Sequence, residues 1–129
     1  MDTSAVYAVL DRDDDMHPRA AEAWRELLED SESLLTSNYV VLESFALVQR
    51  RLGMEALRVL AGDLLPIMSV EWVGQEDHRT AAQAVLAADR RNLSLVDCAS
   101  FQLMRRIGVQ AAFAFDRHFE EQGFRMLPS

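Results

Sequence analysis

Apolar side chains recur at helical spacing in several segments of the chain and form short continuous runs in others. The helical spacing predicts helices over 5–10, 18–28, 41–52, 54–65, 76–91 and 97–107. The short runs predict strands over 34–36, 67–70, 110–115 and 124–127. Strands that alternate with helices predict an α/β fold, a three-layer α/β/α sandwich around a mostly parallel sheet of about four to five short strands.

Short polar residues and glycines indicate where the predicted helices begin and end. We expect Thr3 or Ser4 to cap the first helix, Asn38 the third and Asp97 the last, which should end at Gly108. No linker, internal repeat or low-complexity stretch divides the chain. The pattern therefore predicts a single domain over 1–129.

Acidic residues at the edges of apolar segments are the main chemical signal, and they are Asp2, Glu43, Asp97 and Asp116. A carboxylate at the end of a buried segment is costly to desolvate unless something compensates it. In parallel sheets, ligands bind beyond the carboxyl ends of the strands, and all four side chains can face that crevice. Converging carboxylates repel one another, and a divalent cation is the usual remedy. The sequence therefore predicts a Mg²⁺ or Mn²⁺ site.

Each of these acids also has a structural explanation when it is taken alone. Asp97 is a natural helix cap, where the helix dipole stabilises a negative charge. Asp116 can start a turn, Asp2 can be a polar terminus, and Glu43 can be a partly exposed helical residue. Only the joint pattern favours the metal site.

Composition narrows the class of protein. The chain has 129 residues, half of them apolar, with no continuous apolar stretch long enough for a transmembrane helix. The first residues lack the basic and apolar regions of a secretory signal. Cys98 is the only cysteine, which excludes an internal disulfide and a cysteine-based zinc site. We therefore expect a cytoplasmic protein.

The charge pattern bears on partners and on other enzyme classes. The formal net charge is −8, which disfavours a nucleic-acid partner unless cations offset the four clustered acids. All 13 basic residues are arginine, and the absence of lysine argues against a P-loop and against phosphatases that rely on a lysine. Three arginine pairs can contact RNA phosphates or lie on solvated helix faces: Arg50 and Arg51, Arg90 and Arg91, and Arg105 and Arg106.

Four segments together resemble the PIN domain, and within it the VapC-type ribonuclease toxins of bacterial toxin–antitoxin pairs. The resemblance covers nearly the whole chain and is most specific in its last two segments. The segments are 2–5 (DTSA), 37–43 (SNYVVLE), 93–101 (LSLVDCASF) and 114–119 (AFDRHF) followed by Gly123 and Phe124.

The resemblance implies a metal-dependent endoribonuclease that hydrolyses RNA phosphodiesters and is silenced by a cognate antitoxin. It implies Mg²⁺ or Mn²⁺ held by the acids matching Asp2, Glu43, Asp97 and Asp116, and it implies a homodimer, with the helices around Trp24 and over 54–65 as its interface. We expect the three aspartates to contact metal and Glu43 to bind a second ion or orient water. Hydroxyls suited to hydrogen-bond these carboxylates belong to Thr3, Ser4 and Ser100.

The chain departs from the family pattern at two places. Relatives have several apolar residues before the first aspartate, whereas only Met1 precedes Asp2 here. We therefore expect the central first strand to be truncated and the true start to lie upstream. Many relatives carry an acid two places after the last aspartate, where this chain has His118. We expect His118 at the surface, with substrate contact as its alternative role.

Two other functions remain open from the sequence. The first is a housekeeping RNA-processing phosphoesterase on the same fold, which would not arrest growth in a neutralisable way. The second is a non-catalytic protein-binding module whose acids persist only as helix caps. That module predicts no Mn²⁺ affinity and no effect of an Asp97→Asn substitution.

Overall fold

The computed structural model describes residues 1–129, and its strands form two parallel pairs. The first pair joins β1 (Leu34–Ser37) to β2 (Met68–Glu71), with Leu34 opposite Met68. The second joins β3 (Ala111–Phe113) to β4 (Arg125–Leu127), with Ala112 opposite Met126. All the pairings are parallel, as the alternation of helices and strands predicts, which confirms the α/β fold class.

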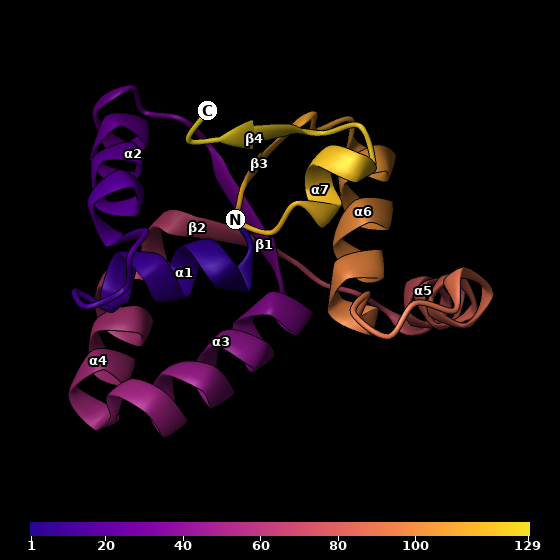
Figure 1. Ribbon diagram of the computed structural model, residues 1–129, viewed down its shortest axis with the longest axis horizontal. Helices are drawn as coiled ribbons and strands as arrows, with labels where there is room; N and C mark the ends of the chain where they lie inside the picture. The colour runs from indigo at the N-terminus through magenta and orange to yellow at the C-terminus, as the bar shows by residue number, and fades with distance from the viewer.

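Helices surround the strands on both sides (Figure 1). In this view α1, α2 and α4 lie on one side of the strands, and α5, α6 and α7 lie on the other. The helices are α1 (Thr3–Leu10), α2 (His17–Glu29), α3 (Asn38–Leu52), α4 (Met54–Val59), α5 (Gln75–Ala88), α6 (Leu95–Ile107) and α7 (His118–Glu121). After α4 the chain continues through a π-helical turn, η1 (Leu60–Leu64), and a 3₁₀ turn, η2 (Leu65–Ile67), before β2.

The hydrophobic core is divided between the two sides of the strands. Around α6, three aromatic rings pack together, with the Phe101 and Phe119 ring centroids 5.1 Å apart and Phe124 stacked 6.0 Å from Phe101. Around α1 and α3, Val48 and Leu60 are fully buried among aliphatic side chains. A third cluster links these two regions, because Phe113 of β3 packs with buried alanines of α1 and α2.

Helix starts are the main correction to the sequence prediction. The cap of α1 is Asp2 rather than Thr3 or Ser4, and the cap of α3 is Ser37 rather than Asn38. Asn38 instead accepts a hydrogen bond from the Val73 N–H through its side-chain oxygen. In each case the residue that ends the preceding extended segment caps the helix, because a cap residue has extended backbone angles. No helix is long and apolar enough to cross a bilayer.

Candidate metal centre

Asp97 lies in the first turn of α6, where the helix start fixes its position. The cap is Ser94, so the prediction that Asp97 is the cap was wrong. Ser94 Oγ accepts from the Asp97 N–H at 3.0 Å, and Asp97 Oδ2 accepts from the Ser94 N–H at 3.0 Å. This reciprocal capping box leaves one carboxylate oxygen free of helix bonds and holds the buried side chain in place.

Asp116 follows β3 and forms the turn into α7. Its Oδ1 accepts from the His118 N–H at 3.0 Å, which is the local bond expected of an aspartate at a turn. Asp97, Asp116 and His118 offer ligand atoms that all lie within 4.8 Å of one another. The structure therefore brings together two acids that are 19 positions apart in the sequence.

Asp2 is buried and close enough to Asp97 for their charges to interact, although it lies outside the 4.8 Å group. Its Oδ2 accepts from Ser4 Oγ at 2.7 Å and from the Ser4 N–H at 3.3 Å. Ser4 Oγ also accepts from the Phe115 N–H at 3.0 Å, which ties α1 to the segment after β3. Burial raises the pKa of the Asp2 carboxyl, and the nearby Asp97 charge raises it further against the Ser4 hydrogen bonds. A cation placed here would relieve that repulsion.

Met1 and Asp2 bind both neighbouring strands. The Met1 amino group donates to the Leu35 carbonyl at 2.7 Å, and Thr36 Oγ1 donates to the Met1 carbonyl at 3.1 Å. The Asp2 N–H donates in the opposite direction, to the Phe113 carbonyl, at 2.9 Å. Burial lowers the pKa of the Met1 amino group to about 6, although the Asp2 carboxylate opposes this shift.

Glu43 is not part of the group. It lies in the second turn of α3, is exposed, and makes no hydrogen bond or ion pair within the chain. Helix α3 contacts α6, which carries Asp97, so Glu43 lies on an element that borders the site. The structure thus brings Asp97 and Asp116 close together, places Asp2 near Asp97, and leaves the Glu43 carboxylate free.

His118 is buried rather than at the surface, so the expectation of a surface histidine was wrong. Its Nε2 donates to the Asn92 carbonyl at 2.9 Å and lies 3.6 Å from Asp116 Oδ1. Its Nδ1 lies 3.5 Å from the Glu121 carboxylate. Because Nε2 is used by Asn92, His118 acts on Asp116 by holding the turn that carries it.

Of the hydroxyls proposed to support the acids, Ser4 does so directly. Ser100 is buried without a hydrogen bond to a carboxylate. Thr3 Oγ1 is buried and has no hydrogen-bond partner, the kind of group that a bound water or ion commonly satisfies. Sequence reasoning missed Ser94, although Ser-x-x-Asp before an apolar run is a recognisable helix start.

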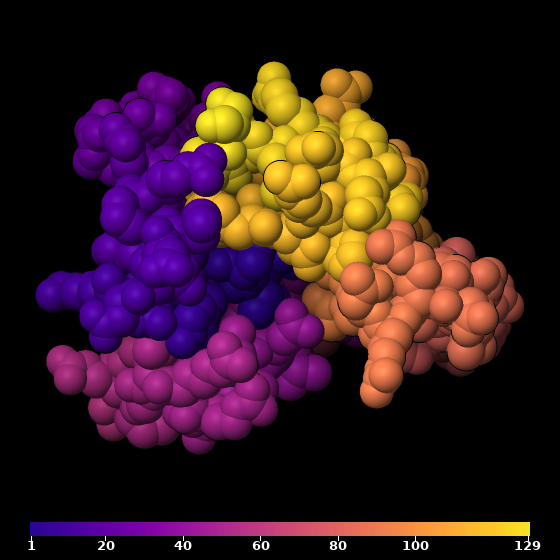
Figure 2. All heavy atoms as spheres, viewed as in Figure 1, coloured from indigo at the N-terminus to yellow at the C-terminus, as the bar shows by residue number.

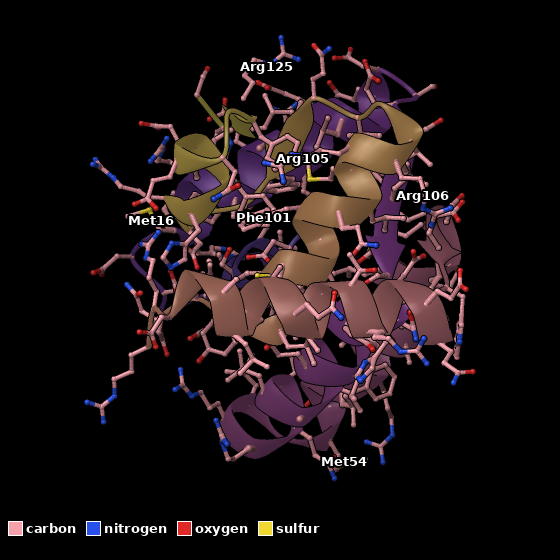
Figure 3. All side chains as sticks on the ribbon, turned by 90° about the vertical axis from the view of Figure 1, so that its right-hand side faces the viewer. Met16, Met54, Phe101, Arg105, Arg106 and Arg125 are labelled. Carbon is pink, nitrogen blue, oxygen red and sulfur yellow. The ribbon has the colours of Figure 1, made fainter.

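The arginine pair on α6, Arg105 and Arg106, binds other residues of the chain (Figure 3). Arg105 donates to Gln122 Oε1 at 2.8 Å and lies over the Phe124 ring, 5.3 Å from its centroid. Arg106 pairs with Asp77 of α5 at 3.4 Å. The two arginines point to different sides of α6 in Figure 3, so they do not form one basic surface.

The donor atoms fit a hard divalent cation. Asp2, Asp97 and Asp116 supply carboxylate oxygens, which Mg²⁺ and Mn²⁺ prefer. The neighbouring Cys98 thiol is a poor alternative ligand, because burial and the Asp97 charge raise its pKa and disfavour the thiolate. Figure 2 shows a hollow between the C-terminal segment in yellow and α3 in purple, with the first residues of the chain visible in it. The hollow gives a ligand access to this part of the molecule.

Comparisons with known proteins agree with this geometry. The PIN domain family model matches residues 1–125. The 23S rRNA-specific endonuclease VapC20 of Mycobacterium tuberculosis, from two strains, is 34% identical over 125 residues, which are 96% of this chain and 93% of the relative. The relative is therefore a few residues longer. The crystal structure of VapC20, described as a Sarcin-Ricin loop cleaving toxin, superposes with a TM-score of 0.83 at 33% identity, covering 95% of this chain and 93% of that one.

Proposed function

This chain belongs to the PIN-domain family and to its VapC-type toxins. We propose that it is an endoribonuclease and that it cleaves the sarcin-ricin loop of 23S rRNA. The single observation that carries the proposal is the pair formed by the buried Asp97 and the half-buried Asp116, whose ligand atoms lie within 4.8 Å, with the buried Asp2 near Asp97. Three carboxylates at one point of the fold suit phosphodiester chemistry far better than they suit helix capping. The substrate loop is inferred from the names of VapC20 and its crystal structure.

Asp2, Asp97 and Asp116 would hold the divalent cation, which we take to be Mg²⁺ or Mn²⁺. When bound, such a cation lowers the pKa of water, neutralises phosphoryl charge and orients the substrate. The protein supplies the fixed geometry, since the capping box holds Asp97 and the Asn92–His118 bond holds the Asp116 turn. Because both supports are hydrogen bonds already formed in the free protein, we expect the carboxylates to keep their positions when RNA arrives.

Glu43 has a different role in this proposal. Its carboxylate is exposed and unpaired on α3, so it is available to orient the attacking water or to meet a second cation once RNA is present. Arg117, exposed between Asp116 and His118, forms no ion pair within the chain and is the arginine best placed to contact an RNA phosphate. Arg105 and Arg106 are already committed to other side chains.

A toxin of this type pairs with an antitoxin, and we propose a homodimer as well. Met54 and Val59 on α4 are 49% and 37% exposed, so α4 offers apolar surface for a second copy. Trp24 packs into the core clusters beside α1, so it contributes less to such an interface than the sequence suggested. A substrate in ribosomes places the activity in the cytoplasm.

The test is cleavage of RNA by the purified protein in Mn²⁺ or Mg²⁺. Intact ribosomes, a short sarcin-ricin loop oligonucleotide and a tRNA pool would be incubated with the wild type and with Asp97→Asn, and product ends would be mapped. We expect one cleavage position in 23S rRNA and in the oligonucleotide, lost with EDTA and in the variant. Cleavage of tRNA alone would refute the loop as substrate and keep the nuclease.

Growth on expression separates the toxin from a housekeeping nuclease. We expect growth arrest that co-expression of the antitoxin from the same operon relieves and that Asp97→Asn abolishes. Unimpaired growth together with site-specific cleavage in vitro would favour RNA processing. No cleavage of any RNA by the folded protein would favour the non-catalytic module.

A further inference from the structure

We propose that an open depression at the C-terminal end of α6 binds a phosphate group, which is carried either by the backbone of an RNA or by a free nucleotide. The depression has a volume of about 540 Å³. Phosphate binding here is independent of the nuclease activity, because it requires neither a cation nor cleavage. The residues that line the depression are Arg105, Gln110, Gln122, Gly123, Phe124 and Arg125.

The lining of this depression is positive in a chain that is negative overall. The formal net charge of the chain is −8, yet two lining residues are arginines and none is an acid. Neither Arg105 nor Arg125 forms an ion pair within the chain. Two cations without a counter-charge make the local potential positive, so the lining favours an anion.

Arg105 is held by neighbours that leave part of its guanidinium free. Its Nη2 donates to the Gln122 carbonyl at 3.2 Å and to Gln122 Oε1 at 2.8 Å. The guanidinium lies over the Phe124 ring, 5.3 Å from its centroid, and its Nε and Nη1 donate to no atom of the chain. Because these contacts fix the direction of the side chain, it loses less conformational freedom when it binds an anion.

The neighbouring Arg106 shows that the helix end alone does not explain these surroundings. Both arginines lie in the last turn of α6, where a positive charge is favourable to the helix dipole. Arg106 pairs with Asp77 at 3.4 Å and does not line the depression, whereas Arg105 meets an amide and a ring. Arg106 is therefore a matched control, since it shares the residue type and the helical turn.

Arg125 supplies the second cation from the strand side of the depression. It is the first residue of β4, it is exposed, and its side chain forms no hydrogen bond or ion pair. Its N–H donates to the Gln110 carbonyl at 2.8 Å, which brings the start of β4 beside the start of β3. In Figure 3, Arg105 and Arg125 both lie in the upper part of the view, away from Met54. Because the Arg125 side chain supports no other group, its substitution tests binding without disturbing the fold.

Two glutamines add neutral donors to the two cations. Gln122 Oε1 accepts from Arg105, so the amide nitrogen of Gln122 remains a donor. Gln110 is exposed, and its side chain forms no hydrogen bond. A carboxylate has two oxygens that one arginine can satisfy, whereas a phosphate has further acceptor oxygens and a larger charge. Donors from four side chains therefore fit a phosphate better than they fit a carboxylate.

The depression and the metal centre lie at opposite ends of the same elements. Gln110 immediately precedes β3, whereas Asp116 follows it. Along α6, Asp97 lies in the first turn and Arg105 in the last, about 12 Å apart at 1.5 Å per residue. A phosphate bound in the depression is therefore distinct from a phosphate at the acids. We expect substitutions in the depression to weaken ligand affinity and to leave the chemistry at the acids unchanged.

Binding in the presence of EDTA tests the depression without the metal centre. Nuclear magnetic resonance would follow the amide signals of the lining residues during titration with inorganic phosphate, with AMP and with a short single-stranded RNA. The proteins would be the wild type, Arg105→Gln, Arg125→Gln and the control Arg106→Gln. We expect saturable shifts in the wild type and the control, and at least about tenfold weaker binding by the other two variants.

The three probes separate the two sources of phosphate. Saturable binding of AMP that Arg125→Gln weakens would identify a free nucleotide as a ligand. Binding of RNA without binding of AMP would identify the RNA backbone, and the slope of log affinity against log salt should then become shallower by about 0.7 in Arg125→Gln.

Two results would overturn the phosphate site. The first is equal binding of all three probes by the wild type and Arg125→Gln, or binding of none. The second is a set of shifts caused by polyglutamate and by none of the three probes, which would assign the depression to an acidic protein segment. Because EDTA removes metal-dependent cleavage from the measurement, each result is independent of the outcome of the ribonuclease assay.

Discussion

The carboxylates of the candidate centre are held in two different ways. Asp97 and Asp116 lie on a capped helix and on a turn, and both elements pack on the aromatic cluster of Phe101, Phe119 and Phe124. Asp2 caps α1 beside a cavity of about 430 Å³ that residues of β1 and β3 line, and its N–H donates to the Phe113 carbonyl. Local hydrogen bonds are enough to place a side chain in the first setting. In the second setting, placement depends on sheet pairing between segments far apart in the chain.

The largest effect should come from a substitution of Asp97, which the capped helix α6 holds in place. Asp97→Asn keeps the side-chain volume and a hydrogen-bond acceptor for Ser94, but it removes the charge that a cation needs. We expect cleavage to fall by more than about 100-fold, beyond the loss typical of residues that only support metal ligands. The measurement is the initial rate of loop cleavage.

The control for this variant is Asp63→Asn, an equivalent change on an exposed acid of η1 that is distant in sequence from the site. It should cleave at the wild-type rate. If Asp97→Asn retained activity within tenfold of this control, Asp97 would be a structural residue only.

The buried Met1 amino group and Asp2 carboxyl should make the stability of the protein depend on pH. The folded chain lowers the pKa of the Met1 amino group to about 6 from an ordinary value of 8.0. The unfolded chain therefore binds more protons between these values, and stability rises as pH increases from 6 to 8, by roughly 1–3 kcal/mol. The raised pKa of Asp2 acts in the opposite sense, because there the folded state binds more protons, and this contribution to stability is lost as pH rises.

Chemical denaturation of free and N-terminally acetylated protein isolates the amino group, since acetylation leaves the carboxyl of Asp2 in place. We expect the free protein to gain stability relative to the acetylated one between pH 6 and pH 8. Parallel curves for the two proteins would mean that the amino group is solvated in the folded state.

Ser4→Ala tests the link between Asp2 and the segment that follows β3. Ser4 Oγ donates to the Asp2 carboxylate and accepts from the Phe115 N–H, so its loss leaves the Phe115 N–H without a partner and Asp2 with only the Ser4 N–H bond. We expect the free energy of unfolding to fall by roughly 1–2 kcal/mol, measured by urea denaturation. Ser33→Ala, with no hydrogen bond from its side chain, is the control. An equal effect of both substitutions would contradict the bridging role of Ser4.

The smallest effect should come from an exposed ion pair on the surface of α6. Arg106 pairs with Asp77 at 3.4 Å on the surface, where its side chain is 49% exposed. Arg106→Gln should therefore change the free energy of unfolding by less than about 1 kcal/mol and leave cleavage unchanged. A large loss of RNA affinity in this variant would instead assign Arg106 to substrate binding.

The sequence predicted the surroundings of Asp97 and Asp116 more completely than those of Asp2. Asp116 after an apolar strand and Asp97 before a helix are local patterns, and both acids are near where they were expected. At the start of α6 the prediction was wrong by three positions, because the cap is Ser94 and not Asp97. Both residues belong to the same capping signature, which is present in the sequence. Local rules suffice there because both hydrogen bonds of the capping box lie within four residues.

The contacts of Asp2 and His118 could not be predicted in the same way. The cavity beside Asp2 lies between β1 and β3, which are more than 70 positions apart in the sequence, and no local pattern predicts such a contact. The buried His118 donates a hydrogen bond to the Asn92 carbonyl, 26 positions away in the sequence. Glu43 was predicted at the site from its place at the edge of an apolar segment and from the family resemblance, and its exposed place on α3 leaves that role a proposal.

The most direct test of the cation centre is Mn²⁺ binding measured by isothermal titration calorimetry. It would use the wild type, Asp97→Asn and the control Asp63→Asn at the same pH. We expect saturable binding by the wild type and the control, and at least about tenfold weaker binding by Asp97→Asn. Equal affinities in all three folded proteins, or no binding in any, would contradict the metal centre and leave these acids as a helix cap and a turn.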